Sequence, residues 1–541
     1  MGRHAAGNSF INAYLELSPP NQRFATYVTE SDHARNFEER LRANGRLEPL
    51  SVITKQNLKD LTQFNPLYIP GPEIAYHSLR RSLLDSTAWS LCGITHTTAS
   101  ASAMDSVSEV LTCPVQPWDA IICTSSAVKN NVKVILERQE ELLRERLGIS
   151  KVVLPQLPVI PLGIHTKDFA FTTEQRAKAR AMLNVNPETI VVLYTGRLSF
   201  HAKAHPFAMY QALERAANST GQEVVLLECG WHANEQIANA FSSGARLGCP
   251  SIRVVTLDGR ETENRDNAWS AADIFCSLSD NIQETFGIVP IEAMAAGLPV
   301  IVSDWDGYKD SVRDGVDGFR VPTIAPSPGL GGDLAYRHAL EIDTYDMYCG
   351  HSSSLVAINS QKLTKAFVEL FTSSTLRKKM GMAGRERAIE HYDWRSIIPR
   401  YEALWAEQTR IRLAAKKNHE IKAKAGAILP PTWPARLDPT ISFANYPTQH
   451  LSATTQLILA DKTAETAFSK MEKYRKLAMV SYARHVFPTD EEIRSVFEIA
   501  ESKLPNGCTA EKLISGVSSH RRPYVLRGLV WLCKLGLIHY S

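Results

Sequence analysis

Residues 283–304 read Q-E-T-F-G-I-V-P-I-E-A-M-A-A-G-L-P-V-I-V-S-D, and this stretch decides the fold. It follows the apolar run ADIFCSLS at 272–279, which is typical of a buried strand. A polar loop then carries Glu284 and Gly287, and a short helix is expected from about Pro290. The stretch therefore predicts a strand, loop and helix whose glycine loop lies at the carboxyl edge of a parallel sheet, where open α/β folds bind ligands.

The same alternation of strand and helix extends outward in both directions. From 189 to 304, apolar runs such as TIVVLYTG (189–196) and EVVLLECG (223–230) alternate with amphipathic helical stretches. Between about 20 and 165, shorter apolar runs alternate with polar segments that are compatible with helices. Two such blocks predict an α/β protein with two facing Rossmann-like domains, each built on a parallel sheet covered by helices.

The composition changes after the second block. Residues 410–424 carry six bases and one acid, and four prolines follow between 430 and 439, which indicates a linker. Beyond it, Thr489 and Glu492 form a capping box at the start of a helix in a small, mainly helical domain. The predicted parts are an N-terminal Rossmann-like domain at 1–165, a C-terminal one with closing helices at 166–410, a linker at 411–448 and a helical domain at 449–541.

Composition and charge exclude several classes of protein. The formal net charge of +3 argues against a bulk nucleic-acid binder, and no apolar run approaches the eighteen or so residues of a membrane-spanning helix. The first ten residues, MGRHAAGNSF, contain no apolar core of a signal peptide. Nine cysteines without a C-x-x-C pair indicate reduced thiols rather than a disulfide framework or a zinc site. A cytoplasmic protein is expected, with the basic segment 410–424 either solvated or in peripheral contact with the inner face of the membrane.

A second polar loop, T-G-R-L-S-F-H-A-K at 195–203, follows a predicted strand of the same sheet. Its Arg197 and Lys203 would stand near Glu284, and two cations on a strand-to-helix loop suit a diphosphate. Taken singly, each feature has an ordinary alternative. The two cations could simply be solvated, and Glu292 could be a carboxylate in the first turn of a helix, where the dipole favours it.

Together these segments resemble the family-4 retaining glycosyltransferases, which have the GT-B fold of two facing Rossmann-like domains. The family's pair of glutamates separated by seven residues matches Glu284 and Glu292, and its G-R-L…K loop matches residues 196–203. P-L-G-I-H at 161–165 is similar to the family's domain crossover, with histidine where aspartate is usual. I-T-H-T at 94–97 resembles the segment whose histidine contacts the donor sugar.

The resemblance implies a role for each matched residue. His96 and Glu284 would be the catalytic residues, close to the transferred sugar. Donor binding would involve the two cations, which neutralise the diphosphate, and Glu292, which accepts hydrogen bonds from the ribose. The glycine loops would contribute as well. The full donor-binding set is Gly7, Arg197, Lys203, Thr285, Phe286, Gly287 and Glu292. Gly7 belongs here because G-R-H-A-A-G at 2–7 looks like the family's first glycine loop, although the chain has no residues for a strand before it.

The implied activity is that of a retaining hexosyltransferase that moves a sugar from a UDP- or GDP-linked donor to an acceptor hydroxyl. No cofactor and no metal are expected, because paired cations and helix-terminal N–H groups supply the electrostatic stabilisation. The expected partners are the donor and a glycan or glycolipid acceptor in surface polysaccharide or glycoconjugate synthesis, with a homo-oligomer left open.

An alternative of another class is a GT-B-fold binding or regulatory protein that recognises a partner or nucleic acid through its C-terminal domain. C-T-A-E-K-L-I-S-G-V at 508–517 and the basic helix 523–535 weakly resemble a winged helix. The other interpretation of this domain is a protein–protein or intramolecular docking module. Specific nucleic-acid binding is not expected, since the four bases of residues 513–541, Arg521, Arg522, Arg527 and Lys534, attract phosphates only weakly.

Overall fold

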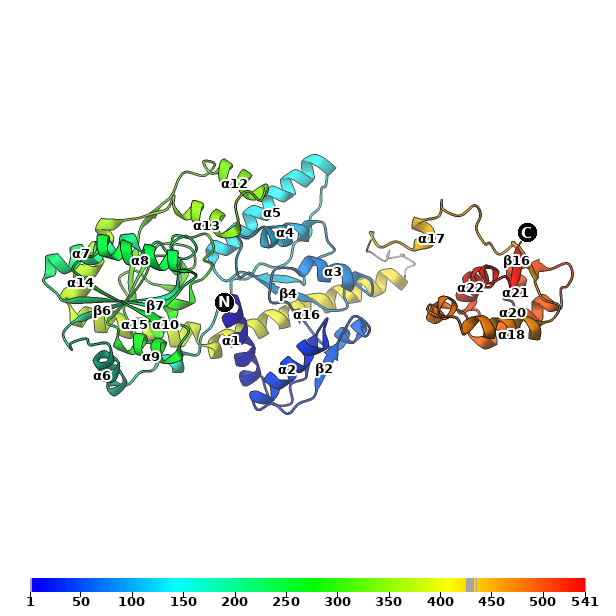
Figure 1. Ribbon diagram of the computed structural model, residues 1–541, viewed down its shortest axis with the longest axis horizontal. Coiled ribbons are helices and arrows are strands. Elements are labelled where there is room, and N and C mark those ends of the chain that lie inside the picture. The colour runs from blue at the N-terminus through cyan, green and yellow to red at the C-terminus, as the bar shows by residue number, and fades with distance from the viewer. Residues whose placement is uncertain (1, 425–432, 434, 541) are drawn as a thin grey trace. The chain divides into compact units, whose positions relative to one another are not determined.

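The computed structural model describes residues 2–424, 433 and 435–540 (Figure 1), which form two compact units, Met1–Trp433 and Pro434–Ser541. The first unit contains two α/β lobes. Its N-terminal lobe carries a two-stranded parallel sheet, β1–β2, and a three-stranded parallel sheet in the order β3-β4-β5. Its C-terminal lobe carries a six-stranded, all-parallel sheet in the order β11-β10-β9-β6-β7-β8. The prediction of two α/β domains with parallel sheets is confirmed.

The bounds of the elements follow the predicted apolar runs closely. The strands of the N-terminal lobe are β1 (Phe24–Tyr27), β2 (Leu50–Ile53), β3 (Leu67–Tyr68), β4 (Leu91–Ile94) and β5 (Ala120–Ile122), and its helices are α1 (Gly2–Leu17), α2 (Ser31–Ala43), α3 (Ile74–Ser82), α4 (Ala101–Ser108) and α5 (Ser126–Leu147). The strands of the large sheet are β6 (Ile190–Leu198), β7 (Val224–His232), β8 (Arg253–Asp258), β9 (Ile274–Ser277), β10 (Val300–Ser303) and β11 (Gly318–Val321).

The helices of the C-terminal lobe are α6 (Thr173–Met182), α7 (Phe207–Thr220), α8 (Glu235–Gly248), α9 (Thr262–Ala271), α10 (Ile288–Ala295), α11 (Tyr308–Ser311), α14 (Ser360–Thr372) and α15 (Ser374–Tyr392). Two short strands, β12 (Thr323–Ile324) and β13 (Ala357–Ile358), pair antiparallel. They enclose an excursion of the chain, residues 325–356, that contains α12 (Gly332–Ala339) and α13 (Tyr345–Ser353).

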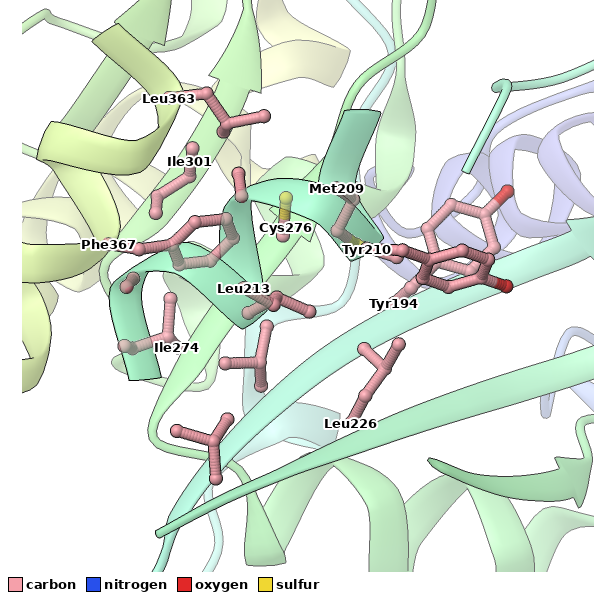
Figure 2. Close-up of a cluster of buried hydrophobic side chains, with 14 of the residues drawn as sticks. Tyr194, Met209, Tyr210, Leu213, Leu226, Ile274, Cys276, Ile301, Leu363 and Phe367 are labelled. Carbon is pink, nitrogen blue, oxygen red and sulfur yellow. The ribbon is translucent and has the colours of Figure 1, made fainter. Parts of the chain in front are cut away.

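Both faces of the strands β6, β7, β9 and β10 are largely buried, which explains why these strands are continuous apolar runs rather than alternating ones. Successive residues of β6 enter opposite cores: Val192 packs with α7, α8 and α14, while Val191 packs with α6, α9, α10 and α15. Figure 2 shows the first of these cores, in which Leu213 of α7 and Phe367 of α14 gather with Ile274 and other strand residues. The two cores hold the strand ends in a fixed frame, and the loops that leave those ends carry the polar residues of interest.

The long helix α16 (Trp394–Lys424) corrects the predicted boundary between 410 and 411, because residues 411–424 are helical rather than part of a linker. Its first residues join the lobes, since Trp394 is buried and its indole N–H donates to Ser9 of α1 at 2.8 Å. Further along, the Gln408 amide donates to the carbonyls of Leu91 and Trp118 at 2.9 and 3.0 Å. Helix α16, which follows the C-terminal lobe in the chain, therefore packs as part of the N-terminal lobe. The rest of the predicted linker includes 425–432 and 434, which lie outside the described residues.

The prediction of a glycine loop at residues 2–7 is wrong, since these residues begin helix α1. The helix packs against α16, where the rings of Phe10 and Tyr401 lie 4.9 Å apart. A Cβ added to Gly7 would meet nothing within 4 Å, so this glycine is not required by close packing. Gly7 as a donor contact gains no support from the fold.

Two bases of the segment 410–424, Arg410 and Arg412, make contacts inside the first unit. Arg410 pairs with Glu407 at 2.6 Å. Arg412 is 8% exposed and donates to the Thr87 carbonyl at 2.8 Å, which ties α16 to the N-terminal lobe. Lys422 and Lys424 lie among residues whose side chains the structure does not describe. Within the described ranges, no helix is long and apolar enough to cross a membrane.

The second unit is mainly helical around a three-stranded antiparallel sheet in the order β15-β14-β16. Its elements are α17 (Pro439–Ser442), β14 (Gln456–Leu459), α18 (Ala464–Arg475), α19 (Ala478–Ser481), α20 (Asp490–Glu501), β15 (Cys508–Thr509), α21 (Ala510–Leu513), α22 (Arg522–Lys534) and β16 (Ile538–Tyr540). The predicted capping box of Thr489 and Glu492 is present at α20. The likeness to a winged helix stays a prediction.

A fully buried ion pair fixes the core of the N-terminal lobe. Arg81 and Asp119 are both 0% exposed and meet in two hydrogen bonds of 2.6 and 2.7 Å, while the Asp119 carboxylate also accepts from the Leu91 and Gln116 amides. The pair thereby links α3, β4 and the segment that leads into β5.

We expect Asp119→Ala to destabilise this lobe by about 3–5 kcal/mol, because it leaves a buried guanidinium without a counter-charge. Urea unfolding followed by tryptophan fluorescence measures the loss, since Trp89 and Trp118 lie in the same lobe. The matched control is Glu141→Ala, which removes an exposed partner of Arg138 and should cost about 0.5 kcal/mol or less. Equal, small losses in both variants would contradict the buried pair.

Candidate functional site

The site is built where the strands of the large sheet end. Gly196, near the end of β6, has φ of +142°, and a Cβ on Gly230 of β7 would lie 1.9 Å from the Gly196 carbonyl oxygen. A side chain at Gly230 is therefore excluded by the neighbouring backbone. These glycines let the two strand ends approach each other, and Arg197 follows directly on the first of them.

Strand β6 extends to Leu198, so Arg197 stands at the end of the strand rather than in the predicted loop 195–203. The cationic loop that follows carries Lys203, and both residues contact the segment after β9. The Arg197 guanidinium donates to the Gln283 side-chain oxygen at 2.9 Å and to the Ala202 carbonyl at 3.2 Å. The backbone of the loop is held by the Asn281 amide, which donates to the His201 carbonyl at 2.8 Å. Lys203 reaches Glu284, with 3.4 Å between Nζ and Oε2. The structure thus brings Arg197, Lys203 and Glu284 together, as the sequence predicted.

Glu284 is held as a carboxylate. Its side chain is 17% exposed, and its Oε1 accepts from the backbone N–H groups of Thr285 and Gly287 at 3.3 and 3.1 Å. Burial raises its pKa, but the nearby Lys203 charge and the hydrogen bonds outweigh burial and leave the pKa below its ordinary value. The group is consequently an anion throughout the physiological pH range and can accept hydrogen bonds from hydroxyls.

The backbone after Glu284 is fixed by a close approach of two loops. Gly287 has φ of +77° and precedes α10, and a Cβ there would lie 1.9 Å from the ring of Tyr308. Gly307 is equally confined, since its Cβ would meet the backbone of Phe286 at 2.5 Å. The Phe286 side chain is buried in the core, so only its backbone is available to a donor. The Gly287 conformation and its packing explain why glycine stands at this position.

Glu292 lies in the second turn of α10, because the helix begins at Ile288. This position removes the alternative in which Glu292 serves the dipole of the first turn. Burial raises its pKa to about 7, and the charge of Arg265 on α9 lowers it in part. Arg265 itself is held by the carbonyl of Gly259 at 2.8 Å. Sequence reasoning missed Arg265, which has no motif around it.

His96 follows β4 of the N-terminal lobe and reaches the Glu284 loop through its backbone. The Thr285 hydroxyl donates to the His96 carbonyl at 3.1 Å. Further links lie beside it: the Ser126 amide donates to Asp310 at 2.6 Å, and the Ser125 hydroxyl donates to Asp306 at 3.3 Å. The ends of β4 and β5 therefore face the donor loops of the other lobe, and His96 lies at that junction.

Three further residues at this junction were not predicted. Gln283 stands next to the motif and binds Arg197, which lies 86 positions away. Tyr345 on α13 shares a hydrogen bond of 3.1 Å with Thr97. Asp306 is partly buried, and burial together with the Glu284 charge raises its pKa to about 8. Within the described part of the chain, no group of three His, Cys, Asp or Glu side chains is placed to hold a metal ion.

Residues 175–326 match the family model described as glycosyl transferases group 1. This part of the chain is therefore similar to the glycosyl transferases of group 1. It contains Arg197, Lys203, Glu284 and Glu292, so the resemblance inferred from the motifs is confirmed for the C-terminal lobe. His96 lies outside the matched residues, in the lobe that faces the segment.

Curated relatives cover the same region. A D-inositol 3-phosphate glycosyltransferase of Mycobacterium sp. (strain KMS) is 34% identical over 153 residues, which is 28% of this chain and 33% of the relative. A phosphatidyl-myo-inositol mannosyltransferase of Mycobacterium leprae (strain TN) is 31% identical over 153 residues, 27% of this chain and 31% of the relative. The chain thus spans about a third of the length of the curated relatives it matches.

Solved structures match over a longer range at lower identity. Anabaena Alr3699/HepE in complex with UDP is 15% identical with a TM-score of 0.49, covering 74% of this chain and 96% of that chain. A sucrose-phosphate synthase from Thermosynechococcus elongatus is 19% identical with a TM-score of 0.39, covering 66% of this chain and 81% of that chain.

Arg197→Ala should lower kcat/KM for the nucleotide-sugar about 10–150-fold, because a hydrogen bond to a charged group contributes roughly 1.5–3 kcal/mol. Release of nucleoside diphosphate from the donor is the measurement. Arg253→Ala is the matched control, since Arg253 begins β8 and so lies at the opposite edge of the same sheet. Wild-type activity in Arg197→Ala would remove this residue from the site.

Glu292 gives a prediction that depends on pH. A carboxylate accepts stronger hydrogen bonds from ribose hydroxyls than a neutral acid, and this group ionises as pH rises through about 7. The ratio of nucleoside diphosphate affinities, wild type over Glu292→Gln, should therefore rise roughly 3–10-fold between pH 6 and pH 8. Calorimetric titrations at several pH values measure it, and ionisation of the ligand cancels in the ratio. Parallel pH profiles for the two proteins would contradict the ribose contact.

Proposed function

We propose that this protein is a retaining glycosyltransferase that transfers a hexose from a UDP- or GDP-linked donor to an acceptor hydroxyl. The observation that carries the proposal is the grouping of Arg197 and Lys203 beside the anionic Glu284, at the carboxyl edge of a parallel sheet and inside the matched segment. The curated relatives over this segment are named as a glycosyltransferase and a mannosyltransferase, which supports glycosyl transfer.

Each residue would contribute one step of the chemistry. Arg197 and Lys203 would neutralise the diphosphate as it leaves, when its negative charge grows. Glu284 would hold the sugar hydroxyls, because its lowered pKa keeps it a hydrogen-bond acceptor. Glu292 would accept from the ribose. His96 would stand at the reacting face, on the side of the acceptor.

Retention would follow a front-face route, in which the leaving phosphate takes the proton of the acceptor hydroxyl. The two cations then act on the same oxygen atoms that receive the proton, so no metal and no cofactor are included in the proposal. The acceptor would be a glycan or glycolipid bound by the N-terminal lobe, in surface polysaccharide or glycoconjugate synthesis. A cytoplasmic location with peripheral membrane contact, and assembly into a homo-oligomer, stay predictions from the sequence.

Some of the basic residues on which the regulatory alternative depends make contacts within the second unit. Arg521 makes a two-pronged ion pair with Glu492 at 2.7 and 3.0 Å, and Arg522 donates to the carbonyls of Val517 and Ser515. Two of the four bases that could meet phosphates are therefore committed within the unit. The enzyme is the better supported function.

A nucleotide screen tests the proposal directly. Thermal-shift measurements with UDP, GDP and ADP should show stabilisation by one of them, since a ligand at 100 times its Kd adds ~2.7 kcal/mol. The chain shortened after Trp433 should respond equally, because the donor residues lie in the first compact unit. Donor turnover should persist in EDTA. No response to any of these nucleotides, or complete loss of turnover in EDTA, would refute the proposal.

A further inference from the structure

The excursion 325–356 is an ordered element that leaves the large sheet and returns to it. Its two ends are joined where β12 and β13 pair, and its two helices are tied together by Asp343, a carboxylate that is 4% exposed. Asp343 accepts from Arg337 of α12 at 2.7 and 3.0 Å and lies 3.1 Å from Nδ1 of His351 on α13. The rings of His338 and Tyr348 stack with centroids 4.0 Å apart. These contacts give α13 a defined position.

Helix α13 packs directly on the cationic loop of the donor site. A Cβ on Gly350 would lie 3.0 Å from Cβ of His201, so the helix and the loop are in close contact. The next residue toward the start of the helix, Cys349, is fully buried, and its pKa is raised to about 11 by burial and lowered in part by the Arg197 charge. Cys349 of α13 therefore lies near Arg197, the cation that is assigned to the diphosphate.

At its first residue, the same helix reaches the other lobe. The hydroxyl of Tyr345 lies 3.1 Å from the hydroxyl of Thr97, the neighbour of His96. Burial raises the pKa of the Tyr345 phenol, and hydrogen bonding by Thr97 and Gln283 lowers it in part, which places Gln283 beside the same hydroxyl. Gln283 in turn accepts from Arg197 at 2.9 Å. A continuous chain of polar contacts thus runs from Arg197 to the His96 segment.

We propose that Tyr345 is a positioning residue that couples the His96 segment of the N-terminal lobe to the Arg197–Gln283 pair of the donor site. Its hydroxyl bridges the two lobes only when they stand together, so the donor cation and the acceptor-side histidine reach their working positions in one step. The inference rests on the proposed function for its effect on turnover, whereas the bridge itself can be tested without any substrate.

The first test uses Tyr345→Phe, which removes the hydroxyl and keeps the ring, with Tyr348→Phe on the same helix as the matched control. The kcat for release of nucleoside diphosphate from UDP-glucose or GDP-mannose, whichever the wild type turns over, should fall about 3–10-fold, the loss expected for one neutral hydrogen bond. The KM for that donor should change less than about twofold, because the contacts of Glu292 are untouched. Tyr348→Phe should behave as the wild type. A Tyr345→Phe variant with unchanged kcat would overturn the proposal.

Thr97→Val completes a double-variant cycle. If both hydroxyls serve one bridge, the double variant should lose no more turnover than the more affected single variant. Losses that multiply would mean that the two residues act separately, which would overturn the bridge.

Amide hydrogen exchange provides the readout that needs no donor. Tyr345→Phe should speed exchange at 94–100 and at 281–287, and Tyr348→Phe should not. Unchanged exchange in Tyr345→Phe would overturn the bridge even in an active enzyme. Conversely, faster exchange in a protein that binds no nucleoside diphosphate would refute the proposed function while leaving the coupling of the lobes intact.

Discussion

The site depends on keeping one enclosed carboxylate charged. Glu284 lies mostly out of water, where an unpaired anion would be costly, yet Lys203 and two backbone N–H groups hold its pKa below the ordinary value. Those N–H groups are available only because Gly287 adopts a left-handed conformation against the ring of Tyr308. The charge of one side chain therefore sets the shape of the loop, the position of the lysine and the start of α10.

The second requirement is that the two lobes meet at this loop. Their contacts at this loop include three hydrogen bonds: Thr285 with His96, Asp306 with Ser125 and Asp310 with Ser126. At the other side of the unit, α16 holds the lobes through the buried ring of Trp394. The lobes are thus joined by apolar packing at the start of α16 and by polar contacts around the Glu284 loop.

The sequence was sufficient to predict the structure wherever the local residue pattern and the tertiary structure agree. The strands β6, β7, β9 and β10 were predictable because both of their faces are largely buried, and Arg197 and the Glu284 loop lie at or after the ends of such strands. It failed where the structure depends on distant partners. Residues 2–7 contain two glycines and are helical because α1 packs on α16, and residues 411–424 continue a helix whose Arg412 binds carbonyls of the N-terminal lobe. Tyr345 lies in an excursion without a motif, so only the folded chain shows that it reaches Thr97.

The acidic residues around the site affect its net charge, which should not be negative in a site that is proposed to bind a diphosphate. Asp280 is buried and Asp306 is partly buried, and burial raises their pKa values to about 7 and about 8. Glu292 has a pKa of about 7 for the same reason. Near pH 7 a large share of these groups is therefore protonated. Glu284 is held as an anion, which Lys203 offsets, and Arg197 adds a positive charge beside the pair. Burial of the acids, as much as the number of bases, therefore lowers the negative charge that an anion would meet at this edge of the sheet.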